Sequence, residues 1–441
     1  MTKESYVASR FNVIVSDGEE KLLYNSFTNA LATLDLDSYT RFIELANGGL
    51  IDSDREVDSM LLKGGYFVDS TLNEIERVRI VHHVGRFNSN VLGLTLVPTT
   101  ACNFACDYCF ENRRPGRMTN EVQDALVDFL RSRRQLQEFH VDWFGGEPTL
   151  GWPVVARLSQ RFREVCSDNG INYGATLVTN GYLLDEAKVD ALPELSIRVV
   201  QVTLDGTAEV HDARRIHLSG QGTFERIVAN LRQFLGRSTH LSIRVNVDER
   251  NRNNVHQLID YLADNGFAWQ ANVGVYFAIV EAFTTAVSTA ETCMTGERFN
   301  GAVVEFTEHA VAAGLAPAPY PHRSIAGCGA TRPDSFVVMP NGDLLKCWAS
   351  VGTEGMEVGN LLDEHLDLLA SPEYVRWLSY DPLARPICRS CAWLPVCMGG
   401  CAWPAVHGEL LGGEESQKAC PMWKDYADSL LNLKRRQVTR K

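Results

Sequence analysis

Three cysteines, Cys102, Cys106 and Cys109, lie in a loop that follows an apolar run ending near Val97. Their CxxxCxxC spacing can bring three thiolates to one iron–sulfur cluster, and it leaves the fourth iron without a protein ligand. Zinc is an alternative, because thiolates suit both metals, but a tetrahedral zinc site needs a fourth ligand and this loop contains no histidine. Three buried thiols without a metal are the other alternative. The spacing favours a cluster with one open iron, which is a binding site for a further ligand.

This motif resembles that of the radical S-adenosylmethionine (SAM) superfamily. The resemblance implies that the open iron binds the amino and carboxylate groups of SAM. It also implies that reduction of a [4Fe–4S] cluster cleaves SAM to a 5'-deoxyadenosyl radical, which abstracts hydrogen from a substrate.

Strand-like and helical patterns alternate through the middle of the chain. Apolar runs typical of strands end near Val97 and occupy residues 139–144, 175–179, 197–204, 241–247 and 273–279. Helical periods separate them, so the strands are expected to form βαβ units with a parallel sheet. We expect an α/β fold whose core is a partial (β/α)6 TIM barrel, with the strand ends sharing one mouth.

The ends of these strands carry further elements of the resemblance. It implies that Gly145, Gly146 and Glu147 bind the SAM amino group, that Thr203 lies near the ribose and that Arg244 binds the carboxylate. The expected SAM contacts are Tyr108, Gly145, Gly146, Glu147, Asn180, Thr203 and Arg244. The alternatives are an ordinary turn for the glycine pair, a salt bridge for Arg244 and simple packing for Tyr108.

Seven further cysteines lie near the C-terminal end, and their spacing resembles the SPASM extension of peptide and protein maturases. They are Cys328, Cys347, Cys388, Cys391, Cys397, Cys401 and Cys420. The resemblance implies two auxiliary [4Fe–4S] clusters, and therefore three clusters in all. By analogy Cys328, Cys347 and Cys401 hold the first auxiliary cluster, and Cys388, Cys391, Cys397 and Cys420 hold the second. A zinc ribbon is the alternative for the CxxC pair.

Two fully ligated auxiliary clusters need eight ligands, and this region offers seven cysteines. The stretch 330–336 has no cysteine where sulfatase maturases carry one. The first auxiliary cluster is therefore expected to keep an open iron for a substrate thiolate, with His322, Asp334 or water as the alternative eighth ligand. Sulfatase maturases also carry an Asp as a general base directly after the cysteine that aligns with Cys347, whereas this chain has Trp348.

The first 90 residues are expected to form a separate module. Strand-like residues 11–15 and 22–26 precede helical stretches at 39–46 and 58–62. This order resembles the winged-helix element that holds a leader peptide by adding it as a strand to a sheet edge. A structural cap on the barrel is the alternative.

Length and charge set the remaining expectations. The chain has 441 residues with 42 basic against 55 acidic ones, which argues against a nucleic-acid partner. It shows no apolar run long enough for a membrane span and no secretion signal, so we expect a cytoplasmic protein. The basic stretch 433–441 is read as a solvated end. The expected domains are a recognition module (1–88), a radical SAM barrel (89–315) and a SPASM domain (316–441).

Together these features predict an oxidoreductase that modifies a ribosomally made precursor peptide and uses a reductant such as flavodoxin or ferredoxin. A thioether cross-link from a substrate cysteine is the first choice. A carbon–carbon or carbon–oxygen cross-link is second, and formylglycine formation of the sulfatase-maturase kind is third. A non-catalytic iron–sulfur electron carrier is the alternative from another class.

Overall fold

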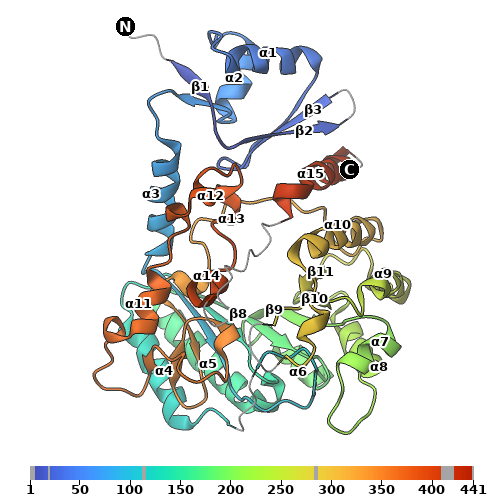
Figure 1. Ribbon diagram of the computed structural model, residues 1–441. Helices are drawn as coiled ribbons and strands as arrows, with labels where there is room; N and C mark the ends of the chain where they lie inside the picture. The colour runs from blue at the N-terminus through green and yellow to red at the C-terminus, as the bar shows by residue number, and fades with distance from the viewer. Residues whose placement is uncertain (1–4, 18–19, 112–115, 283–286, 409–421, 440–441) are drawn as a thin grey trace.

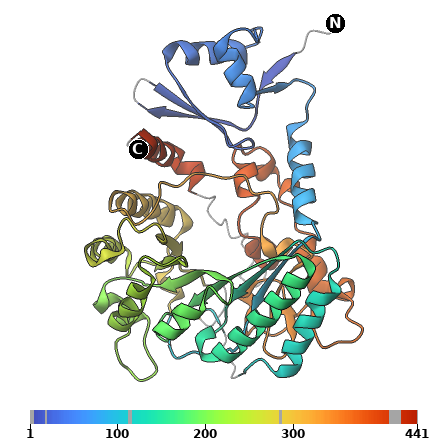
Figure 2. The same ribbon diagram turned by 180° about the vertical axis from the view of Figure 1, so that it is seen from behind.

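The structure is a computed structural model, and it describes residues 5–17, 20–111, 116–282, 287–408 and 422–439. Figure 1 shows an N-terminal module joined by one long helix to a large α/β body, and Figure 2 shows the same arrangement from behind. Helices lie on the outer side of the large sheet, as expected for a barrel of βαβ units.

Six parallel strands form most of this sheet, from the edge strand β11 inward in the order β11-β10-β9-β8-β7-β6. The strands are β6 (Val91–Leu96), β7 (Glu138–Trp143), β8 (Asn172–Thr179), β9 (Ile197–Thr203), β10 (His240–Val247) and β11 (Val273–Ile279). Each coincides, within a few residues, with a strand expected from the sequence. The order along the sheet follows the order in the chain, so successive strand ends lie side by side at one edge. This is the parallel core of a partial TIM barrel.

Helices cross between these strands and bury their apolar faces. They are α4 (Asn120–Ser132), α5 (Trp152–Asn169), α6 (Glu186–Ala191), α7 (Ala208–Arg214), α8 (Phe224–Leu231), α9 (Val255–Leu262) and α10 (Gly296–Ala312). In α4 the Thr119 side chain caps the first turn by accepting from the backbone N–H of Val122. Val122, Leu126 and Leu130 recur every fourth residue and are buried in the barrel core.

The N-terminal module is a small α+β unit. It contains β1 (Tyr6–Ala8), β2 (Asn12–Asp17), β3 (Glu20–Asn25), β4 (Leu31–Leu34), α1 (Leu36–Ala46), α2 (Glu56–Lys63) and β5 (Phe67–Asp69). An antiparallel sheet runs in the order β2-β3-β4, and β1 pairs with β5. Arg41 of α1 and Asp58 of α2 form a buried ion pair at 2.6 Å that joins the two helices.

The C-terminal region contributes to the barrel sheet. Strand β12 (Ser335–Val338) runs parallel to β6, and β13 (Asp343–Leu345) and β14 (Gly359–Asn360) continue the sheet. The helices of this region are α11 (Pro372–Leu378), α12 (Pro386–Arg389), α13 (Leu394–Cys397), α14 (Trp403–His407) and α15 (Trp423–Thr439). Strands β12, β13 and β14 of this region therefore extend the barrel sheet beyond β6.

Helix α15 lies between the N-terminal module and α10 (Figure 1). Its Leu430 and Leu431 share an apolar cluster with Val15 of β2 and Val304 of α10. Arg435 pairs with Glu20. The basic stretch was expected to be a solvated end; residues 433–437 continue α15 without being buried, and Gln437 accepts from the backbone N–H of Ala318 at 3.0 Å, so this part is anchored to the protein.

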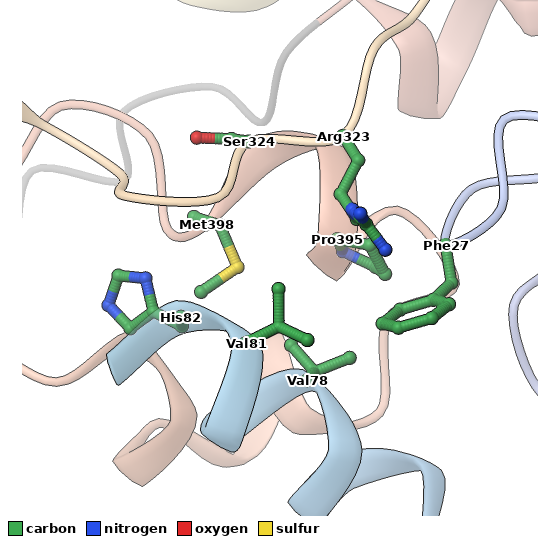
Figure 3. Close-up of a pocket in the computed structure, with 8 residues that line it drawn as sticks. All are labelled: Phe27, Val78, Val81, His82, Arg323, Ser324, Pro395 and Met398. Atoms are coloured by element: carbon green, nitrogen blue, oxygen red, sulfur yellow. The ribbon is translucent and has the colours of Figure 1, made fainter. Parts of the chain in front are cut away.

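Helix α3 (Glu74–Arg86) runs from the module to the C-terminal region. Figure 3 shows its Val78, Val81 and His82 facing Phe27, Pro395 and Met398 around a small cavity. At the far end of α3 the buried Arg86 guanidinium donates to the carbonyl oxygens of Thr331, Leu378 and Tyr380, at 2.6–2.9 Å. In the described part of the chain, no helix has the length and apolar composition to cross a membrane.

Candidate functional site

The cysteine loop follows β6 and is fixed by backbone contacts on both sides. Phe104 forms a β-bridge with His217, supported by hydrogen bonds from Ala105 N to Ile216 O (2.7 Å) and from Leu218 N to Asn103 O (3.0 Å). Side-chain contacts add to this, because Arg250 donates to the Asp107 carboxylate at 2.5 Å. The three cysteines are half-buried. Their positions are therefore set by segments far away in the sequence.

The glycine pair after β7 packs directly on this loop. Gly145 has φ +111°, a backbone conformation that favours glycine. A Cβ at Gly146 would lie 2.5 Å from the carbonyl oxygens of both Thr100 and Ala101. Glycine is required here for a close approach of two backbones, and the backbone N–H of Glu147 donates to Ala101 O at 2.9 Å.

Glu147 is a fully buried carboxylate held by four hydrogen bonds. Its Oε1 accepts from Thr149 N (2.9 Å), Thr149 Oγ1 (2.5 Å) and Thr179 Oγ1 (2.7 Å), and its Oε2 accepts from Asn180 N (2.7 Å). No cationic side chain among the described residues forms an ion pair with it. Oε2 keeps acceptor capacity, since a carboxylate oxygen has two lone pairs.

One cleft of about 370 Å³ brings the expected residues together. Its lining includes every residue expected to contact SAM and the three loop cysteines: Cys102, Cys106, Tyr108, Cys109, Gly145, Gly146, Glu147, Asn180, Thr203 and Arg244. Cys401 and Trp348 also line it. The cleft lies at the C-terminal ends of the parallel strands, where barrel active sites are found.

Tyr108 takes part in a buried polar network as well as lining the cleft. Its hydroxyl donates to Asp205 and accepts from Arg215 Nη1 at 2.6 Å and from Asn246 Nδ2 at 3.3 Å. Burial raises the pKa of Tyr108 well above its usual range, so the phenol stays protonated at neutral pH. The ring is thereby held in one orientation at the cleft wall.

The other expected contacts sit on neighbouring strands. Thr203 ends β9 and lies beside Arg244 in the register of β9 with β10. Arg244 Nε donates to Asn246 Oδ1 at 2.7 Å, and the guanidinium also hydrogen-bonds with Tyr276; a guanidinium has five N–H groups, so donors remain for a ligand. The Asn180 side chain donates to Asn103 Oδ1 at 2.7 Å and so ties the end of β8 to the cysteine loop.

The donor groups of this cleft suit an iron–sulfur cluster held by three cysteines together with SAM. Three thiols and an uncompensated buried carboxylate face one cleft, and an ammonium group is the natural counter-charge for Glu147. In the ranges that the structure describes, no three His, Cys, Asp or Glu side chains are grouped to hold a single metal ion.

The C-terminal cysteines fall into two areas. Cys328 and Cys347 pack against one apolar cluster that contains Ala402, and the Cys328 thiol interacts electrostatically with Cys401. Cys388, Cys391 and Cys397 lie on or next to α12 and α13, towards the N-terminal module. Cys420 lies outside the described residues. Cys166 is buried in the barrel core.

Sequence reasoning missed several residues of the cleft and of its support. Asp205, Arg215 and Asn246 hold Tyr108, and Phe144 packs on Trp348 with ring centroids 5.6 Å apart. Asp205 follows directly on the strand end that carries Thr203, so its position was a usable signal. Arg215 carried no such signal, because only the pairing of residues 216–218 with the cysteine loop brings it to the site.

The fold and cleft can now be compared with known proteins. The Radical SAM superfamily profile matches residues 96–262. The cysteine-type anaerobic sulfatase-maturating enzyme of Clostridium perfringens is 23% identical over 342 residues, covering 70% of this chain and 88% of that protein. The radical SAM cyclopropyl synthase TigE of Paramaledivibacter caminithermalis is 20% identical over 473 residues, and the match covers 96% of this chain and 95% of that protein. The mycofactocin maturase MftC of Mycobacterium tuberculosis is 26% identical over 350 residues, and the match covers 73% of this chain and 81% of that protein.

Solved structures share the fold. Native anSMEcpe with bound AdoMet and Cp18Cys peptide gives a TM-score of 0.59 at 19% identity, covering 79% of this chain and 98% of that one. Streptococcus suis SuiB bound to precursor peptide SuiA gives a TM-score of 0.53 at 17% identity, and the match covers 90% of this chain and 96% of that one. A radical SAM domain implies SAM and a [4Fe–4S] cluster as cofactors. The chain therefore carries a radical SAM domain, and the protein is a radical SAM enzyme.

Proposed function

We propose that this enzyme is a maturase of a ribosomally made precursor peptide, in which it installs an oxidative cross-link, with a cysteine thioether as the first choice. Relatives support the class of substrate: they include maturases and a structure with a bound precursor peptide. The thioether rests on this chain's own cysteines and cleft.

One observation carries the proposal: the expected SAM site and an expected auxiliary ligand open onto the same cleft. Cys102, Cys106 and Cys109 line it together with Cys401 and Trp348. Cys401 is exposed, and Trp348 is 46% exposed despite its large apolar ring. A peptide segment in this cleft would reach both the radical source and the first auxiliary site.

The reaction balances in hydrogens and electrons. When bound, SAM and its cluster supply a radical that removes one hydrogen atom from a substrate carbon. The substrate cysteine loses its thiol proton, and its sulfur bonds to that carbon. One electron is released, and an auxiliary cluster accepts it. The proposed ligands are Cys328, Cys347 and Cys401 for the first auxiliary cluster and Cys388, Cys391, Cys397 and Cys420 for the second.

Phe144 and Trp348 would form the apolar wall beside the reacting substrate residue. Their rings pack together at an angle of 30° and would limit the room for water at that side of the cleft, which would protect a carbon radical. The indole of Trp348 cannot accept a proton as a carboxylate general base would. This supports cross-linking over formylglycine chemistry.

We propose that the leader peptide adds to the N-terminal module at β4. The sheet has two edges, β2 and β4, and the Asn432 side chain of α15 already donates to Ser16 O of β2 at 3.1 Å. Asn25 N donates to Ala30 O at 2.9 Å, so alternation along the antiparallel pair directs the backbone groups of Leu31 and Thr33 outward. Thr33 is exposed and offers its N–H and C=O to a further strand.

SAM cleavage is the first test. Protein reconstituted without oxygen is mixed with SAM and dithionite, and 5'-deoxyadenosine is measured. We expect product from the wild type, no product from Cys102→Ala, and auxiliary iron retained in that variant. Cleavage by Cys102→Ala would contradict the assignment of this cysteine, and absence of product from wild type with reduced clusters would favour the electron-carrier alternative.

The substrate test uses a short peptide encoded beside this gene. With a cysteine-containing precursor we expect loss of two hydrogens and loss of one free thiol per cross-link. A precursor that loses two hydrogens while every thiol stays reactive would instead support a carbon–carbon or carbon–oxygen link.

The leader test uses Thr33→Pro with Thr33→Val as its matched control. Proline removes the outward N–H and is tolerated at a sheet edge, whereas valine keeps the N–H. We expect weaker leader binding only in the proline variant, measured by fluorescence anisotropy of a labelled leader. Equal binding by both variants would rule out β4 as the docking edge.

A further inference from the structure

A buried arginine beside the cysteine loop has no carboxylate partner. Arg215 is 8% exposed and lines the cleft. Its Nη1 donates to the Tyr108 hydroxyl at 2.6 Å, and its Nε has no hydrogen-bond partner. Among the described residues, no Asp or Glu lies within ion-pair distance of its guanidinium group. Buried charges are normally paired, so this arrangement needs a counter-charge.

The neighbouring arginines show the contrast. Arg214 Nη1 lies 2.7 Å from both oxygens of Asp248. Arg250 bonds to Asp248 and Asp107. Asp205 interacts electrostatically with Arg215 but forms no direct ion pair with it: Asp205 accepts from the Tyr108 hydroxyl and lies 3.7 Å from Arg214 Nε. Arg214 therefore has a directly bonded carboxylate within the protein, whereas Arg215 has none among the described residues.

The cysteine loop lies on the other side of Arg215. The guanidinium interacts electrostatically with Cys106, and its position is fixed because residues 216 and 218 pair with the loop backbone. Thiolate sulfurs ligating iron are negatively charged. A cluster held by three such thiolates carries net negative charge and gains one more unit on reduction, and net charge is one of the factors that set cluster potentials.

We propose that Arg215 is the counter-charge of the cluster held by Cys102, Cys106 and Cys109, and that it raises the reduction potential of this cluster. The inference rests on the proposed cofactor site. A fixed buried cation favours the reduced, more negative state by Coulomb attraction, which is strong where water is excluded. Arg215 is a positioning and tuning residue, since the reacting atoms lie on the substrate and SAM.

The test is a redox titration monitored by electron paramagnetic resonance on anoxic, reconstituted protein. The relevant signal is the one that changes when SAM is added and is absent from Cys102→Ala, because the first auxiliary cluster is also expected to keep an open iron. We expect Arg215→Gln to disfavour reduction about tenfold, which lowers the midpoint potential by about 59 mV for one electron. Arg215→Lys should retain most of the wild-type potential.

Tyr108→Phe is the matched control, because it removes the hydrogen bond from Arg215 and leaves the charge in place. We expect its potential to stay closer to wild type than that of Arg215→Gln. A purely structural role for Arg215 predicts the opposite: similar shifts in both variants, or none in either. A fully loaded Arg215→Gln cluster with an unchanged potential would overturn the inference.

Loss of the cluster in a variant is also informative. If Arg215→Gln and the bulkier neutral Arg215→Met both fail to bind iron at the loop while Arg215→Lys binds it, the need for a positive charge is supported. If Arg215→Lys fails as well, charge alone is not the requirement and the inference is wrong. A wild-type protein without any SAM-responsive signal would instead refute the proposed cofactor site.

Discussion

Replacing Glu147 by glutamine should weaken SAM binding and cost the fold a free energy of similar size. The change keeps the shape of the side chain and removes its charge. In the structure three donors converge on Oε1 and one on Oε2. A glutamine can point its oxygen at the three donors only by turning its NH2 group towards Asn180 N–H. We expect that clash of two donors to cost about 1–3 kcal/mol of unfolding free energy.

The effect on SAM follows from the lost charge. A hydrogen bond to a charged group contributes about 1.5–3 kcal/mol, and 1.4 kcal/mol corresponds to a tenfold change in affinity. Glu147→Gln should therefore raise the SAM dissociation constant about 10- to 100-fold. Equilibrium dialysis with labelled SAM on anoxic, cluster-loaded protein measures this directly.

Thr179→Val is the matched control, because it removes one donor to Glu147 and keeps the carboxylate charged. It also removes the acceptor of Gly181 N, so we expect a stability loss of about 1–2 kcal/mol. Its SAM affinity should fall much less than that of Glu147→Gln. The reasoning fails if both variants lose the same affinity, or if Glu147→Gln binds SAM within about threefold of wild type.

Three further predictions concern the support of the site and the module. Gly146→Ala places a Cβ 2.5 Å from two backbone carbonyl oxygens. It should therefore destabilise the barrel by about 1–3 kcal/mol and reduce the iron bound at the cysteine loop. Full iron loading with an unchanged denaturation midpoint would contradict this prediction. Arg86→Ala leaves three carbonyl oxygens without their buried donor and should cost at least about 2 kcal/mol, measured by denaturant unfolding, with exposed Arg77→Ala as the control. The hydrogen bonds from Arg41 lower the pKa of Asp58 below its ordinary value of 3.8. The Asp58 carboxylate therefore contributes its full stabilisation above pH 3.8, and this stabilisation is lost as the pH falls through the lowered pKa. Asp58→Asn should flatten this acid part of the curve of unfolding free energy against pH, and an identical acid part in both proteins would refute the assignment.

Periodicity and motif spacing were enough to predict the barrel. Buried apolar residues recur at every second position of strands such as β6, β7 and β10, and this period of two separates the strands from the amphipathic helices between them. The SAM contacts at strand ends were predictable for the same reason, since parallel strand ends meet at one edge. Short strands such as β4 and β12 gave too little pattern to be found, and β12 joins the sheet only through a partner more than 200 residues away.

The sequence by itself determined which thiols and carboxylates are present, at what spacing, and on which strand ends. Those are local properties of the chain. Only the tertiary structure decided that residues 216–218 pair with the cysteine loop, that Arg215 lies near Cys106 without a directly bonded carboxylate, and that Cys401 reaches the same cleft. Such contacts depend on burial and on packing between distant segments, and no local pattern encodes the charge balance of a site that several elements build together.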